Sequence, residues 1–225
     1  MTGTDTGVGK TYVATLIVRA LVAAGHRVGV YKPVASGCWR EGDLLHSDDA
    51  DALWVAAGNP GDPDCVCPQR FEAPLAPHLA AQAEGKRVDK SLLRDGIEYW
   101  ADRCDVIVVE GAGGLMSPVS DDDYVADVAF EFGYPLVVVA PNVLGVINQT
   151  LQTLITAATF RDGIPVAGVV LNNLFESSRV RDDPSIKTNR DELARRCVPP
   201  VLAEVNWISD EFDADVNWRE AADSD

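Results

Sequence analysis

The segment from Gly3 to Thr11 contains the residue types that bind nucleotide phosphates. It reads Gly-Thr-Asp-Thr-Gly-Val-Gly-Lys-Thr and runs directly into a helical pattern. In such a loop, glycines let backbone N–H groups approach a phosphate, a lysine binds the β and γ oxygens, and a Thr hydroxyl binds Mg²⁺. The common spacing requires a glycine at position 4, where this chain has Thr, so the loop that starts at Gly3 is one residue longer. We expect the nucleotide contacts to come from Gly7, Val8, Gly9, Lys10, Thr11 and Tyr12.

Four further segments place polar side chains where predicted strands end or a helix begins. Lys32 follows one strand, Glu110 follows another and precedes a glycine loop, and the Asn172-Asn173 pair follows a third. Asp48 and Asp49 open a helical pattern. Each has an ordinary structural explanation by itself, such as a helix cap for Asp49. Together, behind a phosphate-binding loop, they predict a ligand site at the carboxyl edge of a parallel sheet.

The elements that must position these residues alternate between strands and helices. The strand candidates are apolar at nearly every position, which is typical of parallel strands covered on both faces; they are Arg27–Tyr31, Asp105–Val109, Pro135–Ala140 and Val166–Leu171. The amphipathic helical stretches are Thr11–Ala24, Ser91–Arg103, Ala126–Phe132 and Ile147–Asp162. This alternation predicts an α/β fold, a doubly wound and mainly parallel sheet with helices on both faces.

The two ends of the chain carry separate expectations. A phosphate-binding loop normally follows a buried strand, but only Met1 and Thr2 precede Gly3, so we expect the first strand to be absent or truncated. A missing central strand would leave backbone groups of its neighbours unpaired. We expect residues 1–225 to form a single domain, in which the acidic segment from about 210 to 225 is a mobile tail.

Composition excludes several classes of protein. The 19 Lys and Arg against 35 Asp and Glu give a net charge of −16, which repels nucleic acids and anionic membranes. The five cysteines are odd in number and scattered, so neither a disulfide framework nor a zinc site at Cys65 and Cys67 is favoured. No secretory signal and no apolar run of membrane-spanning length is visible, and we expect a cytoplasmic protein.

In combination, these segments resemble the dethiobiotin synthetase family. The matching blocks are Thr2–Thr11, Tyr31–Gly37, Asp49–Leu53, Pro74–His78, Val109–Gly114 and Leu144–Asn148, in the order in which the family has them. The Lys-Pro-Val-Ala-Ser-Gly and Val-Glu-Gly-Ala-Gly-Gly pair is the most specific part. The resemblance implies a P-loop NTPase fold and ATP- and Mg²⁺-dependent closure of 7,8-diaminononanoate and CO₂ (or bicarbonate) to dethiobiotin. It implies a carbamate and a carbamic-phosphoric anhydride on the way, and a homodimer.

The resemblance also implies roles for individual residues. Lys32 and Lys10 would be catalytic, Ser36 would contact the diamine substrate, and Thr11, Asp49 and Glu110 would hold Mg²⁺, with Asp48 as the alternative to Asp49. The implied ATP contacts beyond the loop are Asp49, Glu110, Gly111, Ala112, Gly113, Asn172, Asn173, Asn206, Trp207 and Ile208. The family commonly has Pro-Trp-Leu where this chain has Asn206-Trp207-Ile208, so this loop is less constrained.

The main alternative from another class is an ATPase switch of the ParA/MinD type, which binds nucleoid or membrane. Positions 4 to 6 lack the additional lysine of that group, and the charge of −16 leaves no basic surface for a polyanion. A cobyrinate-type amide synthetase would need a further glutaminase domain, for which 225 residues leave no room. A GTPase is disfavoured because the Asn-Lys-x-Asp motif is absent.

Overall fold

All four predicted strands form, and they pair in parallel. In the computed structural model, which describes residues 1–176 and 183–223, strand β6 (Leu136–Pro141) pairs with β7 (Val166–Asn172), and β7 pairs with β8 (Val201–Val205). Strand β2 (Val28–Tyr31) pairs with β5 (Val106–Val109). A separate antiparallel hairpin consists of β3 (Trp39–Glu41) and β4 (Leu44–His46). Both β8 and the hairpin were missed by the sequence reasoning.

The first strand, which we expected to be absent or truncated, is present as two residues. Strand β1 (Thr2–Gly3) pairs in parallel with β6, with Thr2 opposite Val138. On its other side, Met1 N donates to Val109 O at 2.7 Å, and Gly111 N donates to Met1 O at 3.1 Å. Residues 1–3 thus connect the β2–β5 pair to β6 and, through β6, to β7 and β8.

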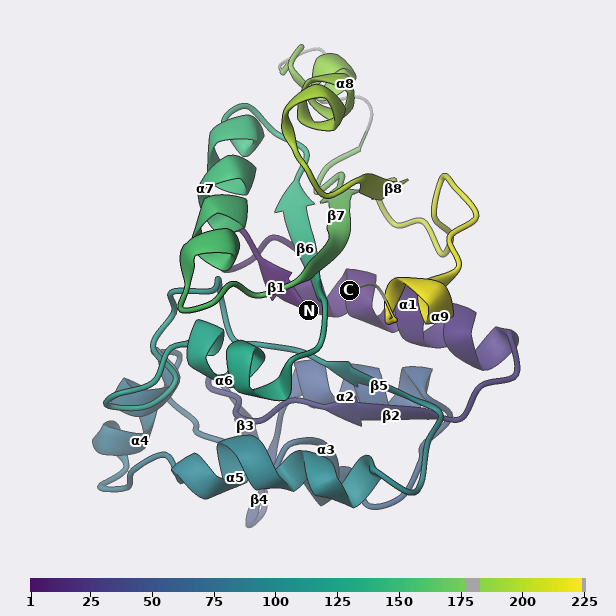
Figure 1. Ribbon diagram of the computed structural model, residues 1–225. Coiled ribbons are helices and arrows are strands. Elements are labelled where there is room, and N and C mark those ends of the chain that lie inside the picture. Colours follow the sequence, from purple (N-terminus) through teal and green to yellow (C-terminus); the bar gives the residue numbers. More distant parts are fainter. Residues whose placement is uncertain (177–182, 224–225) are drawn as a thin grey trace.

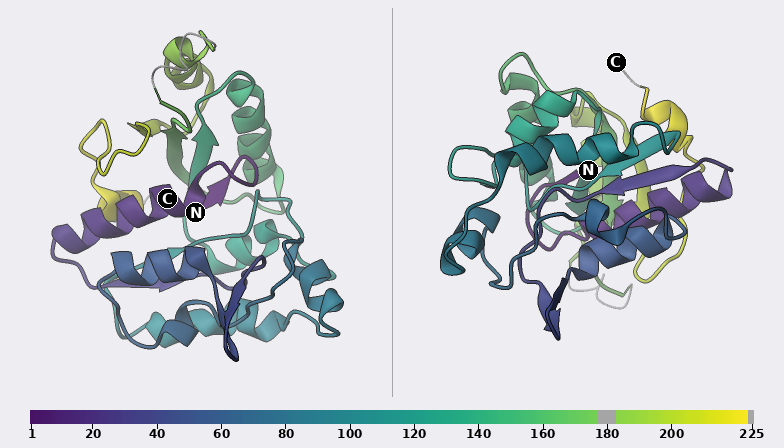
Figure 2. Two further views of the ribbon diagram at one scale, coloured as in Figure 1. Left: turned by 180° about the vertical axis from the view of Figure 1, so that it is seen from behind. Right: turned by 90° about the horizontal axis from the view of Figure 1, so that it is seen from below.

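Helices cover both faces of the sheet, which confirms the α/β prediction (Figures 1 and 2). One face carries α1 (Lys10–Ala23), α2 (Asp48–Ala56) and the short α9 (Trp218–Ala221), and the other carries α5 (Lys90–Asp95), α6 (Val125–Phe132) and α7 (Val146–Thr159). The connection from α2 to α5 contains α3 (Pro63–Val66) and α4 (Pro77–Ala83), and α8 (Ile186–Arg196) precedes β8. Among the described residues, no helix is long and apolar enough to cross a lipid bilayer.

The helix predicted over Ser91–Arg103 is divided. An α-helix ends at Asp95 and a 3₁₀ turn follows from Gly96 to Trp100. A Cβ at Gly96 would lie 2.3 Å from the hydroxyl oxygen of Tyr31, so the backbone approaches β2 closely at the point of division. The change to the tighter 3₁₀ geometry therefore coincides with a tertiary contact that amphipathic periodicity does not reveal.

Much of the acidic C-terminal segment packs on the sheet and on α1, although we expected residues 210 to 225 to be a mobile tail. Phe212 forms a β-bridge with Val205 of β8, and Trp218 is only 6% exposed in the same core cluster as α1. The rings of Phe212 and Trp218 lie 4.8 Å apart. Aromatic residues spaced along an acidic segment were the available signal for this packing.

Candidate active site

The phosphate-binding loop connects β1 to α1, and its backbone conformation depends on glycine. Gly9 is the N-cap of α1 and is left-handed, with φ of 86°. A Cβ at Gly9 would lie 2.1 Å from Nδ2 of Asn172, whose side-chain amide donates to Val8 O at 3.0 Å. Lys10 is 8% exposed and its Nζ donates to the carbonyl of Asp5 at 3.2 Å. The loop thus folds back on itself, and no side chain of the described residues caps the N–H groups at the start of α1.

A compact cluster of charged and hydroxyl groups lies beside this loop. Nζ of Lys32, at the end of β2, lies 2.7 Å from Oδ2 of Asp49 and 2.7 Å from Oε1 of Glu110. Oγ1 of Thr11, in the first turn of α1, lies 2.8 Å from Oδ1 of Asp49 and 2.8 Å from Oε1 of Glu110. Residues far apart in the sequence therefore meet at the carboxyl edge of the sheet, as the strand-end pattern predicts.

Opposite charges control the protonation of this cluster. Burial alone would lower the pKa of Lys32, but the charges of Glu110 and Asp49, together with the hydrogen bonds that Lys32 donates to both, raise it above the usual value. Burial alone would raise the pKa of Asp49, but Lys32 and the Thr11 hydrogen bond hold it below its usual range. Lys32 is therefore an ammonium and Asp49 a carboxylate at neutral pH. Burial, with Lys32 as a like charge, lowers the pKa of Lys10.

The donor set around Thr11 suits a hard divalent cation that also binds phosphate. It offers two carboxylates and one hydroxyl, and Oε2 of Glu110 is buried without a hydrogen-bond partner. Mg²⁺ commonly takes only one or two carboxylates from the protein and completes its octahedron with water and phosphate oxygens. Among the described residues, no cluster of three or more His, Cys, Asp or Glu side chains is arranged to hold a metal. The residues thus fit a phosphate-bound cation better than a fully protein-ligated one.

Asp48 and Asp49 occupy different surroundings. Ser47 caps α2 with its hydroxyl, and Asp49 turns toward Thr11 and Lys32. Asp48 instead accepts a hydrogen bond from Nε1 of Trp39 at 2.7 Å in the β3–β4 hairpin. Of the two alternatives left open by the sequence, the geometry favours Asp49 for the cluster.

A cavity opens over the cluster and brings together many of the predicted site residues. Its lining includes Gly7, Gly9, Lys10, Thr11, Lys32, Ser36, Asp49, Glu110, Gly111, Ala112 and Gly113. Thr6, Ser117 and the Pro74–Pro77 segment also line it, and the sequence reasoning assigned them no role. Ser117 Oγ accepts a hydrogen bond from Gly114 N at 2.9 Å, at the end of the glycine loop that follows Glu110. The position of Ser117 shortly after that glycine loop was the available sequence signal.

The residues assigned to the nucleotide base lie at the ends of β7 and β8, outside the lining of this cavity. The side-chain amide of Asn172 is engaged by Val8, and that of Asn173 donates to Oε1 of Glu204 at 2.7 Å. Trp207 is 45% exposed, Ile208 is 73% exposed, and Asn206 accepts from Asn173 Nδ2 at 3.4 Å. In this structure the side chains of Asn172 and Asn173 therefore stabilise the phosphate-binding loop and the loop after β8, respectively.

Tyr12 connects the same region to the phosphate-binding loop. Its hydroxyl donates to the carbonyl of Ser209, directly after Trp207 and Ile208. The loop from 206 to 209 is thereby held against α1, two residues beyond Lys10. A base bound beside this loop would lie close to phosphates held at the start of α1.

Sequence comparisons agree with this arrangement. A protein-family model described as an AAA domain matches residues 1–211. The ATP-dependent dethiobiotin synthetase of Rhodopirellula baltica is 45% identical over 91% of this chain and 82% of its own length. The enzymes of the same name from Anaeromyxobacter dehalogenans strain 2CP-C and Aeromonas salmonicida are 41% and 35% identical, and the matches cover 90% and 94% of their lengths.

Solved structures share the fold at low sequence identity. The MinC:MinD cell division complex of Aquifex aeolicus matches with a TM-score of 0.53 and 14% identity, over 91% of this chain and 79% of that one. A ParA family ATPase from Chlorobium tepidum matches with a TM-score of 0.51 and 17% identity, over 93% and 84%. These likenesses establish the fold alone, whereas the sequence relatives are far closer. The chain belongs to the dethiobiotin synthetase family.

Proposed function

We propose that this protein closes 7,8-diaminononanoate and CO₂ to the cyclic urea dethiobiotin, with ATP and Mg²⁺. One amine takes up CO₂ as a carbamate, and a carbamate oxygen attacks the γ-phosphorus of ATP and releases ADP. The second amine then attacks the carbamoyl carbon, which expels phosphate and closes the ring. The observation that carries the proposal is the meeting of Lys10, Lys32, Thr11, Asp49 and Glu110 beside the Ser36 segment in one cavity. The names of relatives at 35% to 45% identity supply the substrate.

Two lysines suit the electrostatics of this reaction. Phosphoryl transfer to an anionic carbamate brings several negative charges together, so fixed cations stabilise the transition state. Lys10 would bind the β- and γ-phosphates from the start of α1. Lys32 is 3% exposed and stays protonated between its carboxylates, so it presents a permanent positive charge to the carbamate. The backbone N–H groups of Ala112 and Gly113, which line the same cavity, would add further donors.

Mg²⁺ would be held by Thr11, Asp49 and Glu110, where the unpaired Oε2 of Glu110 supplies a free ligand atom. When bound, the ion neutralises charge on the β- and γ-phosphates. Thr11, Asp49 and Glu110 would be its protein ligands. Lys32 contacts the same two carboxylates, so its ammonium group would lie near the transferred phosphoryl group and the carbamate.

The remaining parts of the proposal concern the substrate end, the nucleotide end and the assembly. Ser36 and the Pro74–Pro77 segment would line the diamine site, and Asn172, Asn173 and the Asn206–Ile208 loop would surround the base. We include a homodimer, with Leu144–Asn148 at the interface; Leu144 is 79% exposed, which supports this surface. The small-molecule partners are ATP, CO₂ or bicarbonate and the diamine, and the proposed location is the cytoplasm, where ATP is available.

Incorporation of labelled bicarbonate tests the activity. We expect acid-stable label in a product only when the diamine, ATP and Mg²⁺ are all present, with one phosphate released per product. A mono-amine analogue is the control, because it can be carbamated but cannot close a ring. Phosphate release by folded protein that is unchanged by the diamine would overturn the proposal and would favour an ATPase switch instead.

A further inference from the structure

A network of polar side chains lies where β6, β7 and β8 end, outside the lining of the cavity over the charged cluster. Asn142 directly follows β6 and is 1% exposed, and Asn189 of α8 is 2% exposed. Nδ2 of Asn189 donates to Oδ1 of Asn142 at 2.9 Å, and Nδ2 of Asn142 donates to Oε1 of Glu204 in β8 at 3.0 Å. Buried polar groups are costly unless they are hydrogen-bonded, and a satisfied network specifies one geometry. This network therefore holds the ends of the strands in a defined arrangement.

Asn173, directly after β7, uses its whole side-chain amide in this network. Its Nδ2 lies 2.7 Å from Oε1 of Glu204, 3.1 Å from the carbonyl oxygen of Val205 and 3.4 Å from Oδ1 of Asn206. Its Oδ1 accepts from Nδ2 of Asn142 at 3.0 Å. The reversed orientation of the amide would place its oxygen against three other oxygens. An asparagine amide has two N–H donors and one carbonyl oxygen, so all of these groups have protein partners here.

The loop that begins at Asn206 is held at both ends. At its start, the amide of Asn173 contacts the Asn206 side chain. At its end, the carbonyl of Ser209 accepts from the hydroxyl of Tyr12 in α1. The two residues between these anchors have exposed side chains. The position of the loop therefore depends on the polar network at one end and on α1 at the other.

Glu204 also belongs to a second set of contacts at the neck of the same loop. Its backbone N–H donates to Oδ1 of Asp213 at 2.6 Å, and its carbonyl accepts from Asp213 N at 3.0 Å. Arg190 of α8 pairs with Asp213 and lies 3.9 Å from Oε2 of Glu204, whose side chain is 20% exposed. Removal of this carboxylate would leave the amides of Asn142 and Asn173 without their shared acceptor.

We propose that Glu204 is a positioning residue for the nucleotide base, and that it acts through Asn173 on the loop from 206 to 209. This inference rests on the proposed function, because the base site assigned there includes that loop. Asn173 would hold the loop and would not hydrogen-bond the edge of adenine, because its amide already has protein partners. A carboxylate suits this place, since hydrogen bonds to a charged acceptor are roughly twice as strong as neutral ones.

The test measures the affinity of the full chain for ATP and for inosine triphosphate, each with Mg²⁺, by calorimetry. Inosine triphosphate lacks the amino group at position 6 of the base, so a hydrogen bond to that group is absent from the start. Glu204→Ala removes the acceptor, Glu204→Gln keeps a carbonyl oxygen for the two amides, and Asn173→Ala removes one amide. Glu192→Gln is the matched control, because Glu192 pairs with Arg195 and Arg196 on α8. Binding is measured without the diamine, so failure of ring closure and failure of this proposal are distinguishable.

We expect Glu204→Ala and Asn173→Ala each to weaken the binding of both nucleotides by the same factor, at least about tenfold, because both release the loop. Glu204→Gln should stay within about threefold of the unsubstituted chain, and Glu192→Gln should bind both nucleotides unchanged. The double variant Glu204→Ala/Asn173→Ala should bind within about threefold of the weaker single variant, because the two residues act in series.

Three results would overturn the proposal. Lower melting temperatures of both alanine variants with unchanged nucleotide affinities would mean that the network is only structural. A loss of ATP affinity with unchanged affinity for inosine triphosphate in Asn173→Ala would mean that Asn173 contacts the adenine edge directly. Binding by Glu204→Gln as weak as by Glu204→Ala would mean that the shared acceptor does not hold the loop. If Glu204→Ala does not fold, Asn173→Ala makes the same comparison, because Glu204 then keeps Asn142 as a partner.

Discussion

At the scale of single residues, the charge balance of the site depends on a small number of side chains. Lys32 is the cation that faces both Asp49 and Glu110, and Glu110 is only 1% exposed. A buried carboxylate that loses its partner costs far more than an exposed ion pair contributes. The same lysine therefore has a structural and a chemical role, and the two have to be separated by experiment.

Replacement of Lys32 should abolish turnover and lower stability. For Lys32→Ala we expect a loss in kcat of at least about 10³-fold, because a fixed charge at the transferring group is removed. The free energy of unfolding should fall by about 3 kcal/mol, since Glu110 is left buried and unpaired. Nucleotide binding, measured by calorimetry with Mg²⁺ and ATP, should persist.

Lys90→Ala is the matched control, because Lys90 makes an exposed ion pair with Asp122. This substitution should leave kcat unchanged and alter the free energy of unfolding by no more than about 0.5 kcal/mol. A fully active Lys32→Ala variant would show that Lys32 takes no part in the chemistry.

The hydroxyl of Thr11 should set the requirement for Mg²⁺. Thr11→Val keeps the shape of the side chain but removes one of the three ligand groups, so we expect the Mg²⁺ concentration for half-maximal activity to rise about tenfold or more. Thr15→Val is the control from the next turn of α1, because the Thr15 hydroxyl donates to Tyr12 O and lies outside the cluster. An unchanged Mg²⁺ titration for Thr11→Val would remove Thr11 from the metal site.

At the scale of elements, the phosphate-binding loop is held from outside as well as from within. Asn172, at the end of β7, donates from its side-chain amide to Val8 O, and a Cβ on Gly9 would lie 2.1 Å from that amide nitrogen. The sheet edge and the loop therefore form one packed unit. This contact explains why the glycine at position 9 is needed for space as well as for its positive φ.

Gly9→Ala should damage both the fold and phosphate binding. A left-handed conformation costs a non-glycine residue about 1 kcal/mol, and the added Cβ would also displace Asn172. We expect a loss of more than about 2 kcal/mol in unfolding free energy and at least tenfold weaker ATP binding.

Gly25→Ala isolates the conformational cost. Gly25 has φ of 90° after the end of α1, and nothing lies within 4 Å of an added Cβ. It should lose about 1 kcal/mol and bind ATP normally. Equal effects of the two substitutions would show that the contact with Asn172 carries no weight.

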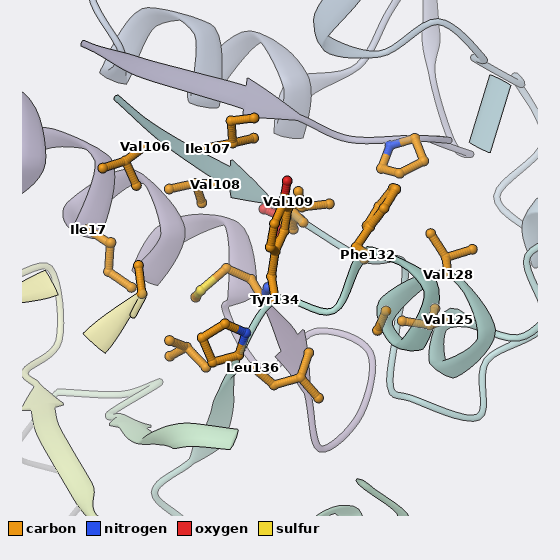
Figure 3. Close-up of a pocket in the computed structure, with 18 of the residues that line it drawn as sticks. Ile17, Val106, Ile107, Val108, Val109, Val125, Val128, Phe132, Tyr134 and Leu136 are labelled. Atoms are coloured by element: carbon orange, nitrogen blue, oxygen red, sulfur yellow. The ribbon is translucent and has the colours of Figure 1, made fainter. Parts of the chain in front are cut away.

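At the scale of the whole molecule, the C-terminal segment closes one face of the sheet. Trp218 is 6% exposed beside α1 and also lines the apolar cavity between β5 and β6 that Figure 3 shows, while the acidic side chains of the segment remain at the surface. Asp213 contributes by pairing with Arg190, and its backbone N–H donates to Glu204 O at 3.0 Å. The negative charge of the segment therefore coexists with ordered packing.

Two tryptophans should separate stability from nucleotide binding. Trp218→Ala should lower the free energy of unfolding by about 3 kcal/mol, as large buried aromatic side chains commonly do. Trp207 is 45% exposed, so Trp207→Ala should leave stability within about 1 kcal/mol but weaken ATP binding if Trp207 contacts the base. Denaturant unfolding and ATP titration of both variants check this. The reverse pattern would contradict both assignments.

The sequence by itself determined the fold class and the family, and it named most of the residues that line the candidate site. Runs such as Leu136–Pro141 are apolar at every position, which indicates a strand that is buried on both faces. The loop from Gly3 to Thr11 is identified as a phosphate-binding loop by its residue types and their spacing. Lys32 and Glu110 could be placed because parallel strands end at a common edge. These are local signals whose meaning does not depend on distant contacts.

Only the tertiary structure decided how distant segments meet. It separated Asp49 from Asp48, engaged Asn172 with Val8, divided the helix at Gly96, and packed Trp218 of an acidic segment beside α1. It also placed Met1 and Thr2 as the end of a strand between β5 and β6. Each of these outcomes depends on pairwise distances between residues far apart in the chain, and local composition and periodicity carry no information about such distances.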